Sequence, residues 1–574
     1  MKLLAGLFLL SSPVVAQNCV YLHEEPTPAA LAGFGSSVSA SQGWAAVGAP
    51  SESRVTLFEL TANPPGPALY EPVTVLQTPG AAGGQFGWSV SLVEDSLLVG
   101  APGEERAYHY QRESNGAWNL VEILEQPIQN AANTKFGFAV AIERNPLATP
   151  HLFVAAFQTY IGGLQYAGAV HAYPTLASGA TDTPFLVTHP SPGFQDRFGV
   201  CLDAAGGALA VGTPYDDTSR GVDSGSVQIF EQSGSSWNHV ETLDAVNSGD
   251  NQYFGISLSL ARNPSGLCVG SENDASGLSF QGAAHVYYRP SGTSNPFVLA
   301  ASLQAPDGQA LDDFGFSVAG IGNTWVIGAR GYDDLRGRVF EYFVTGGQNP
   351  TVTLRNQLSP TSAAGGDLFG HAVDLDDIGG IVIGAQGHRA QGLGGAGGAY
   401  FKVFSSQPTD CNGNGIDDVC DLFAGEETDV DADGVLDSCQ SVGQPFCEGA
   451  TTNSTGVAGQ LLALGTNSIP ANDLVLYGYD LPPNQFALLL ASTNTGIVGY
   501  PGGSQGILCL TGSIGRFDPV LIGSNGVMST QADYQDWPNN GTVLPGQTWH
   551  FQLWHRDQNP TVTSNFSTAW SVSF

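Results

Sequence analysis

The stretch FGWSVSLVEDSLLVGAP, residues 86–102, contains no His, Cys, Lys or Arg, yet similar stretches return along much of the chain. Its opening Phe-Gly pair occurs seven times, with the Phe at positions 34, 86, 136, 198, 254, 314 and 369. A period of 50 to 62 residues with strand-like content is typical of propeller blades, each of which is one small sheet. The motif therefore predicts packing between blades and carries no chemistry of its own.

Each repeat contains four segments with the composition of strands. Phe-Gly opens the first, and the second ends in a turn of the Gly-Ala-Pro type, as in AVGAP (46–50). A third follows a small residue, as in GSVQIF (225–230), and a more polar fourth precedes the next Phe-Gly, as in WNHVETL (237–243). Phe can fill the wedge between neighbouring blades, whereas Gly permits close backbone approach.

The seventh repeat has no fourth strand, because GAYFKVF (398–404) is followed by SSQPTDCNGNG. The segment CVYLHEE, from Cys19, stands before the first Phe-Gly, where the other repeats have their fourth strand. We predict that Val20 to His23, within a closing segment 19–24, complete the last blade of a seven-bladed β-propeller at 17–405. An unclosed sheet edge would otherwise invite aggregation.

The seven copies resemble the FG-GAP repeats found in the headpiece of integrin α-subunits and in many bacterial surface proteins. The resemblance covers residues 19 to 405 and implies a seven-bladed propeller used in binding and adhesion. Integrin blades often carry a calcium loop of alternating carboxylates, whereas these blades offer only fragments of one. For these fragments we favour solvated acidic loops over calcium sites: Asp216, Asp217 and Asp223, and Asp312, Asp313, Asp333 and Asp334.

The bulk composition restricts the partners and the compartment. The 574 residues include 75 Gly and 34 Pro and carry a net charge of −34, which disfavours nucleic acid and anionic lipid as partners. Residues 1–16 read as a signal peptide: Lys2 precedes the apolar run Leu3 to Leu10, and small residues end at Ala16. No later segment is predicted to span a membrane. We therefore expect an exported protein, secreted or at the cell surface.

The segment DCNGNGIDDVCDLFAGEETDVDADGVLDSCQ (410–440) fits two 12-residue calcium loops within a spacer at 406–445. In such a loop, oxygen ligands at positions 1, 3, 5, 7, 9 and 12 surround one Ca²⁺. We therefore predict Ca²⁺ as the cofactor. The residue at position 12 of the second loop is uncharged. An acidic flexible linker is the alternative. The predicted ligands, of which Ile416 and Val435 would use their carbonyl groups, are Asp410, Asn412, Asn414, Ile416, Asp418, Asp421, Asp429, Asp431, Asp433, Val435, Asp437 and Gln440.

The spacer is similar to both thrombospondin type 3 repeats and dockerin modules. Only seven residues separate Asp421 from Asp429, too few for the helix that follows a dockerin loop. We favour the thrombospondin-like interpretation, a spacer stiffened by calcium. Cys201 and Cys268 fall in apolar strand patterns and are expected to be free thiols. Six Cys allow 15 pairings, and one set that fits the predicted closure is Cys19–Cys411, Cys420–Cys439 and Cys447–Cys509.

Residues 446–574 alternate between strand-like runs and Pro, Gly and Asn turns, which predicts a C-terminal β-sandwich and an all-β chain. The alternation of Trp570, Val572 and Phe574 predicts an ordered terminal strand. Four Trp of this region could stack on sugar rings if exposed, but we favour core positions for them: Trp537, Trp549, Trp554 and Trp570.

The search for an enzyme gives no catalytic constellation. GGSQG around Ser504 and GLGGAG (392–397) match a nucleophile elbow and a dinucleotide fingerprint, but both lead into strands where those motifs require helices. We therefore predict a calcium-binding adhesion or interaction protein that is not an enzyme and whose propeller loops bind an extracellular protein or polysaccharide. The alternatives are a hydrolase or lyase acting on extracellular polysaccharide and a dockerin-type component of an extracellular assembly.

Overall fold

The computed structural model describes residues 20–24, 29–402 and 442–574. Short stretches within these ranges are not described: 62–68, 81–82, 128–132, 144–149, 176–179, 235, 262–265, 275–277, 290–295, 346–349, 361–362, 378, 391, 448–449, 466, 468, 470–471, 473, 524–525, 535–536, 539–540 and 559–561. The chain divides into two compact units, and the described strands up to β28 and from β29 onward belong to different ones. The predicted signal peptide, the calcium ligands and four of the predicted disulfide cysteines lie outside the described residues.

The described part of the first unit contains seven antiparallel sheets of four strands each. Six of them take their strands in chain order. These are β2(Ser37–Ser41), β3(Trp44–Ala49), β4(Arg54–Thr61) and β5(Leu69–Gln77); β6(Ser89–Val93), β7(Ser96–Ala101), β8(Arg106–Arg112) and β9(Trp118–Glu125); β10(Val140–Glu143), β11(His151–Ala156), β12(Ala169–Pro174) and β13(Phe185–Val187); β14(Leu202–Ala205), β15(Ala208–Thr213), β16(Ser226–Ser233) and β17(Ser236–Asp244); β18(Phe254–Ala261), β19(Gly266–Ser271), β20(Ala283–Tyr288) and β21(Val298–Leu303); and β22(Phe314–Ile321), β23(Thr324–Ala329), β24(Arg338–Val344) and β25(Val352–Leu358). A four-residue turn, α1(Tyr332–Leu335), joins β23 to β24.

The remaining sheet joins the two ends of this unit. Its order is β1(Val20–Glu24), β28(Gly398–Lys402), β27(Ile381–Ala385) and β26(Phe369–Leu375). Strand β1 runs antiparallel to β28, from Val20 opposite Lys402 to Glu24 opposite Gly398, and so takes the position of the missing fourth strand. Its Tyr21 and His23 extend an aromatic cluster whose centre is Phe401.

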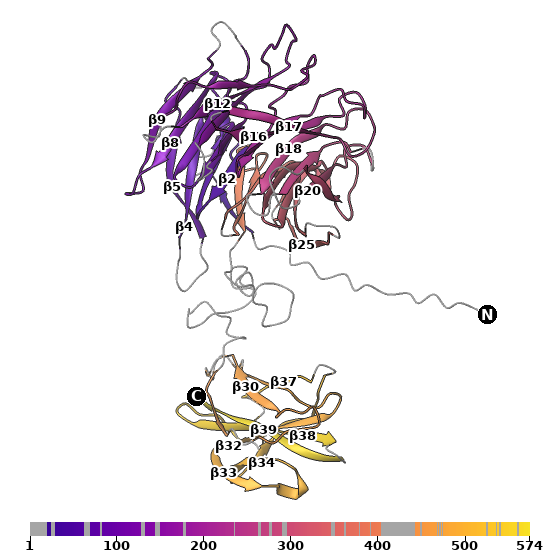
Figure 1. Cartoon of the computed structure of the whole chain (residues 1–574). Coiled ribbons are helices and arrows are strands. Elements are labelled where there is room, and N and C mark those ends of the chain that lie inside the picture. The colour runs from indigo at the N-terminus through magenta and orange to yellow at the C-terminus, as the bar shows by residue number, and fades with distance from the viewer. Residues whose placement is uncertain are drawn as a thin grey trace, which may run out of the picture. The chain divides into compact units, whose positions relative to one another are not determined.

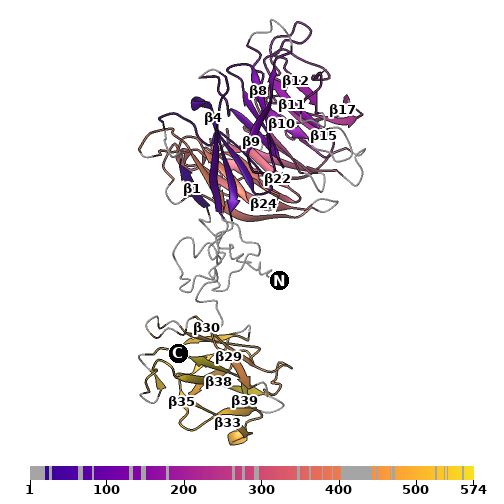
Figure 2. The same cartoon turned by 90° about the vertical axis from the view of Figure 1, so that its left-hand side faces the viewer.

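The first strands of the seven sheets close a ring. Each contacts the first strand of the next sheet, from β2 through β6, β10, β14, β18 and β22 to β26, and β26 in turn contacts β2. Figures 1 and 2 present this unit from two sides. Sheets that surround an axis and pack face to face form a β-propeller.

The Phe-Gly pair is explained by contacts within and between these sheets. All seven Phe are at most 1% exposed, and all seven Gly have φ between +85° and +94°. At Gly35, an added Cβ would lie 2.4 Å from the carbonyl oxygen of Gly398 and, at Gly137, 2.3 Å from that of Arg106. Positive φ and the missing space therefore both require Gly at this position.

In several repeats, a serine lies three residues after the Phe, and its hydroxyl bonds to the next sheet. The hydroxyl of Ser37 donates to the carbonyl of Gly87, 2.9 Å away, and that of Ser257 donates to Gly315 at 2.7 Å. The thiol of Cys201, a free cysteine as predicted, replaces the hydroxyl in the fourth sheet and donates to Gly255. The repeat thus encodes a bond from each such sheet to the Phe-Gly pair of its neighbour.

The second unit contains two larger sheets and a hairpin. One sheet has the order β29(Gln444–Cys447), β39(Val562–Ser573), β38(Thr548–Gln558), β32(Phe486–Ser492) and β35(Gly515–Arg516), with β36(Val520–Leu521) also paired to β32; the other is β30(Gln460–Leu464), β31(Val475–Tyr479) and β37(Met528–Gln531); the hairpin is β33(Asn494–Gly499) and β34(Ile507–Thr511). Strand β29 begins two residues before 446, where we placed the start of this region.

One core lies between the two larger sheets of this unit. Leu461 and Leu476 from the three-stranded sheet share it with Phe551, Leu553 and Val572 from the other sheet. The tryptophans pack against the cores, because Trp537 is 3% exposed and Trp549, Trp554 and Trp570 are partly buried against apolar clusters. The terminal alternation does form a strand, β39, as the sequence predicts.

Candidate functional site: the loop face of the ring

Two sets of loops meet on one face of the ring. The connection between the second and third strands of one sheet bonds to the segment that precedes the first strand of the next. The amide of Leu31 donates to the carbonyl of Gly394 at 3.1 Å, and the amide of Leu311 donates to that of Ser279 at 3.1 Å. We call this the loop face.

The loop face exposes eight large apolar side chains. A soluble surface has scattered apolar residues, but several gathered on one set of loops indicate an interaction site. Their exposed fractions lie between 39% and 74%, for Leu31, Tyr160, Phe194, Val222, Leu278, Leu311, Leu335 and Leu393.

Three of these leucines, Leu31, Leu311 and Leu335, have a left-handed backbone that disfavours them, and the first two share one position in the repeat. The third residue before each Phe has positive φ in all seven repeats, and the other occupants are Gly83, Asn133, Gln195, Asn251 and Gly366. Leu31 and Leu311 stand there with φ of 61° and 71° and with 74% and 63% of their surface exposed. A left-handed backbone costs about 1–2 kcal/mol for an ordinary residue and little for Gly or Asn. Neither packing nor backbone geometry explains these two leucines, whereas contact with a partner would.

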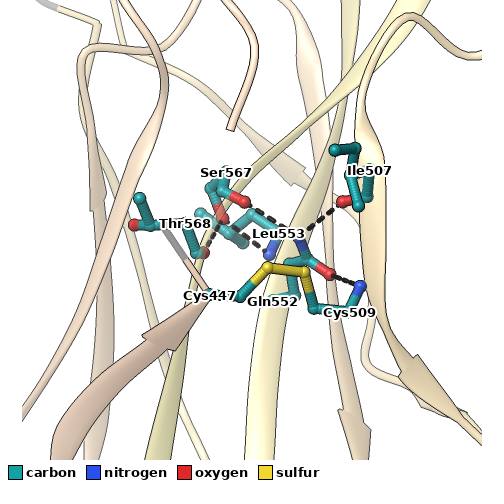
Figure 3. The surroundings of a disulfide bond; sticks show 7 residues. All are labelled: Cys447, Ile507, Cys509, Gln552, Leu553, Ser567 and Thr568. Carbon is teal, nitrogen blue, oxygen red and sulfur yellow. Dashed lines mark hydrogen bonds between the residues drawn. A yellow bond between two sulfur atoms is a disulfide. The ribbon is translucent and has the colours of Figure 1, made fainter. Parts of the chain in front are cut away.

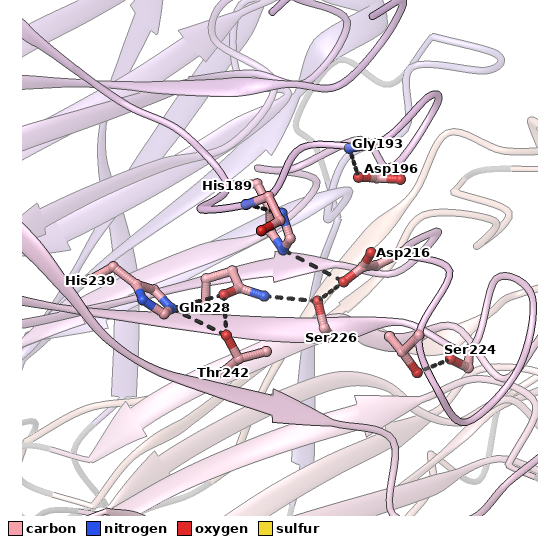
Figure 4. A network of polar contacts seen from close by, with 11 residues as sticks. His189, Gly193, Asp196, Asp216, Ser224, Ser226, Gln228, His239 and Thr242 are labelled. Carbon is pink, nitrogen blue, oxygen red and sulfur yellow. Dashed lines mark hydrogen bonds and ion pairs between the residues drawn. The ribbon is translucent and has the colours of Figure 1, made fainter.

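A buried polar network holds the loop that carries Val222 (Figure 4). Asp216 accepts a bond of 2.6 Å from Ser226 and lies 3.5 Å from Nε2 of His189. The amide side chain of Gln228 continues the chain by donating to Ser226 at 3.0 Å. Ser226 and Gln228 are 0% exposed, and their bonds position the loop.

The acidic fragments of the blades make local contacts within this framework. Asp217 accepts the amide of Asp223 at 2.9 Å, Asp313 pairs with Arg330 at 3.1 Å, and Asp333 pairs with Arg336 at 2.7 Å. Burial and the nearby Asp217 raise the pKa of Asp223. Within the described ranges, no group of three or more His, Cys, Asp or Glu is placed to hold a metal ion.

Carboxylates also lie on the innermost strands, where the polysaccharide-cleaving alternative would require them. Asp203 and Asp374 occupy the position five residues after Phe, and each accepts an amide of the next sheet at 2.8 Å, from Leu260 and Ala40. Burial, with a smaller contribution from Asp203, raises the pKa of Asp374 to about 7. Ser39, Ser91 and Ser259 make the same bond from the same position. The carboxylates therefore bond the sheets to one another.

The sequence analysis found some of these residues and missed others. The predicted ligands from Asp410 to Gln440 lie outside the described residues and stay a prediction. Ser504 donates to the carbonyl of Ser564 and strand β34 follows it, so it is a turn residue as predicted. His388 is 7% exposed and lies between Glu24 and Asp367. The sequence motifs did not identify Leu31 and Leu311 as candidate site residues, although both stand three residues before a Phe-Gly pair.

Comparisons with known proteins find one repeat match and distant structural likenesses. A family model described as FG-GAP repeat matches residues 297–341, which run from just before β21 into β24. The β-propeller domain of Cps50 (Swd1) from Myceliophteria thermophila is 10% identical, and the match covers 67% of this chain and all of that one, with a TM-score of 0.41. A putative 6-phosphogluconolactonase from Bacteroides uniformis is also 10% identical, and the match covers 57% of this chain and 85% of that one, with a TM-score of 0.38.

Neither structural likeness transfers an activity to this chain. A search of curated proteins finds no match. Among the described residues, no helix has the length and apolar character needed to cross a bilayer. The stretch 297–341 is similar to an FG-GAP repeat, and it contains the last strand of one four-stranded sheet and the first strands of the next.

Proposed function

We propose that the chain is an exported binding protein whose loop face holds an extracellular protein partner. In this proposal the first unit is a seven-bladed propeller, the second is a β-sandwich, and the spacer between them binds Ca²⁺. The observation that carries the proposal is the pair of exposed leucines, Leu31 and Leu311, in left-handed backbone. If folding alone set the choice, Asn or Gly would be better tolerated at this backbone position.

The apolar character of the face favours a protein over a charged polymer. Protein interfaces have an apolar core surrounded by polar residues, and the loop face offers leucines beside acidic side chains such as Asp217 and Asp333. A partner with its own apolar patch and basic rim would complement it. The net charge of −34 favours a basic rim as well.

Calcium has a separate role in this proposal. The carboxylates of Asp410, Asp418 and Asp421 would surround one ion with neighbouring oxygens, and Asp429, Asp431 and Asp433 a second. The bound ions would offset repulsion between these carboxylates and stiffen the spacer. Partner binding at the ring and ion binding at the spacer are thus expected to be separable.

A screen of extracellular proteins against the immobilised full chain tests both parts. A partner found there should bind the double variant Leu31→Asn with Leu311→Asn at least about tenfold more weakly, because two apolar contacts are lost. The matched control is Leu120→Asn, which changes an exposed leucine on β9, outside the loop face. Equal loss in the control, or turnover of a polysaccharide by the chain, would contradict the proposal.

Calorimetry on the full chain tests the ion sites. We expect titration with CaCl₂ to report two sites, and Asp410→Ala with Asp429→Ala to remove both. Unchanged calcium binding in that variant would place the ions elsewhere. A cohesin domain that binds the chain would favour the dockerin alternative instead.

A further inference from the structure

The second unit contains a cavity of about 620 Å³ on the face of its larger sheet that points away from the core. The floor is made by residues that alternate along three adjacent strands and so share one face. They are Gln444 and Phe446 on β29, Ser571 and Ser573 on β39, and Thr548 and His550 on β38. The residues between them, such as Trp549 and Val572, pack against the core.

Hydrogen bonds between strands fix these side chains. Thr548 and Ser573 are directly opposite each other and their hydroxyls are 2.9 Å apart, while Nδ1 of His550 lies 2.8 Å from the hydroxyl of Ser571. The ring of Phe446 packs edge-on against His550, with 4.9 Å between centroids. The floor is therefore a preformed row of hydroxyl, amide and imidazole groups beside one aromatic ring.

The cavity carries no formal charge. Of the ten described residues that line it, none is Lys, Arg, Asp or Glu, although the chain as a whole has 52 acidic residues. Burial lowers the pKa of His550, so its imidazole is neutral near pH 7. Serine, threonine and amide side chains both donate and accept hydrogen bonds, as sugar hydroxyls do. Neither anionic nor cationic ligands find a counter-charge here.

A disulfide, shown in Figure 3, links β29, which contributes to the cavity floor, to the hairpin that carries Thr495. Cys447 follows Phe446 on β29, and its partner Cys509 lies on β34, next to Leu510, which pairs with the wall residue Thr495. The buried amide of Gln552 adds to this connection, because it accepts the amide of Cys509 at 2.8 Å and donates to Ile507 and Ser567. The walls are thus fixed by a covalent bond and by the core strand β38.

We propose that this cavity binds a neutral glycan. Its volume lies within the range of small-ligand sites, and its lining joins polar groups of fixed position to an apolar side. An extended peptide that adds to the sheet edge fits less well, since Pro445 on the edge strand β29 has no amide hydrogen to donate. The site lies in a different unit from the loop face and does not depend on the function proposed for the ring.

Affinity electrophoresis of the full chain tests the site directly. Native gels would contain a neutral glycan (dextran, soluble starch, xylan or mixed-linkage β-glucan), with alginate and polygalacturonate as charged comparators. We expect at least one neutral glycan to retard the protein. The variant Thr548→Ala with Ser573→Ala should weaken that retardation about tenfold, because two hydroxyl contacts are lost. The larger side chain of Thr495→Trp should abolish it by filling the cavity.

The matched control is Thr542→Ala with Ser529→Ala, which removes two exposed hydroxyls of the same unit outside the cavity and should leave retardation unchanged. Retardation by none of the neutral glycans would overturn the proposal. So would retardation that survives Thr495→Trp, a preference for the charged polymers, or binding to an immobilised library of extended peptides without any retardation by glycans.

Discussion

The ring and the C-terminal unit are both all-β, but they fix their shapes by different means. The ring joins its ends by pairing β1 with β28, and its two described cysteines, Cys201 and Cys268, are free. The second unit joins β29 to β34 through Cys447–Cys509 and packs two sheets over one core. The ring is stabilised by many similar bonds, each weak, between neighbouring sheets. The second unit depends instead on a few contacts that occur once each, such as its disulfide.

The largest effect should come from breaking the ring at its closure. Phe401 is 0% exposed, and its ring lies within 5.0 Å, centroid to centroid, of Phe58 and Tyr70. Phe401→Ala should destabilise the ring by about 3–5 kcal/mol because it leaves a cavity at the junction of the last and first sheets. Calorimetric unfolding should show the ring transition at lower temperature and the transition of the second unit unchanged. A shift of both transitions would mean that the two units unfold together.

Removing the disulfide should have the converse effect. Cys447→Ser with Cys509→Ser should lower the stability of the second unit by about 2–4 kcal/mol, since the bond closes a loop with a sequence separation of 62 residues. Reductant added to the natural protein should have the same effect and leave the ring transition in place. If reductant also destabilises the ring, a disulfide among residues outside the described ranges, such as the predicted Cys19–Cys411, contributes to its closure.

The contrast also explains what the sequence could predict. Phe-Gly recurs seven times, so a packing requirement that one copy does not reveal becomes visible in the series. The missing fourth strand after residue 404 pointed to Val20 to His23 as its replacement, and the structure pairs Val20–Glu24 there. In the second unit, Gln552 and the pair Thr548–Ser573 act once each, through partners that only the fold brings together. No local pattern announces such contacts, so the cavity could not be predicted.

The stability of the ring should depend on pH through Asp374, whose carboxyl group bonds one sheet to the next. Because burial raises the pKa of Asp374 to about 7, the folded ring holds a proton that the unfolded chain releases at the ordinary Asp pKa of 3.8. The stabilisation is fully present below pH 3.8 and is lost as the pH rises towards 7. Asp374→Asn should flatten this part of the stability profile, measured by urea unfolding at a series of pH values.

Ser259→Ala is the control for that profile. It removes the equivalent bond to Gly320, so it should cost about 1 kcal/mol at every pH and leave the slope unchanged. A profile that keeps its slope in Asp374→Asn would assign the pH dependence to another group, such as Asp196, whose pKa is raised to about 6 by burial.

The smallest expected effect is a change in ring stability that distinguishes a leucine needed for binding from one needed for folding. Leu311→Asn should stabilise the ring by about 1 kcal/mol, because Asn tolerates the φ of 71° better than Leu and the exposed side chain loses no packing. Leu278→Asn changes a leucine of similar exposure on the same face whose φ is not positive, so it should leave stability nearly unchanged. Both variants should weaken partner binding if the loop face is the interface. A destabilised Leu311→Asn would show that this leucine contributes to the fold itself and does not indicate a partner.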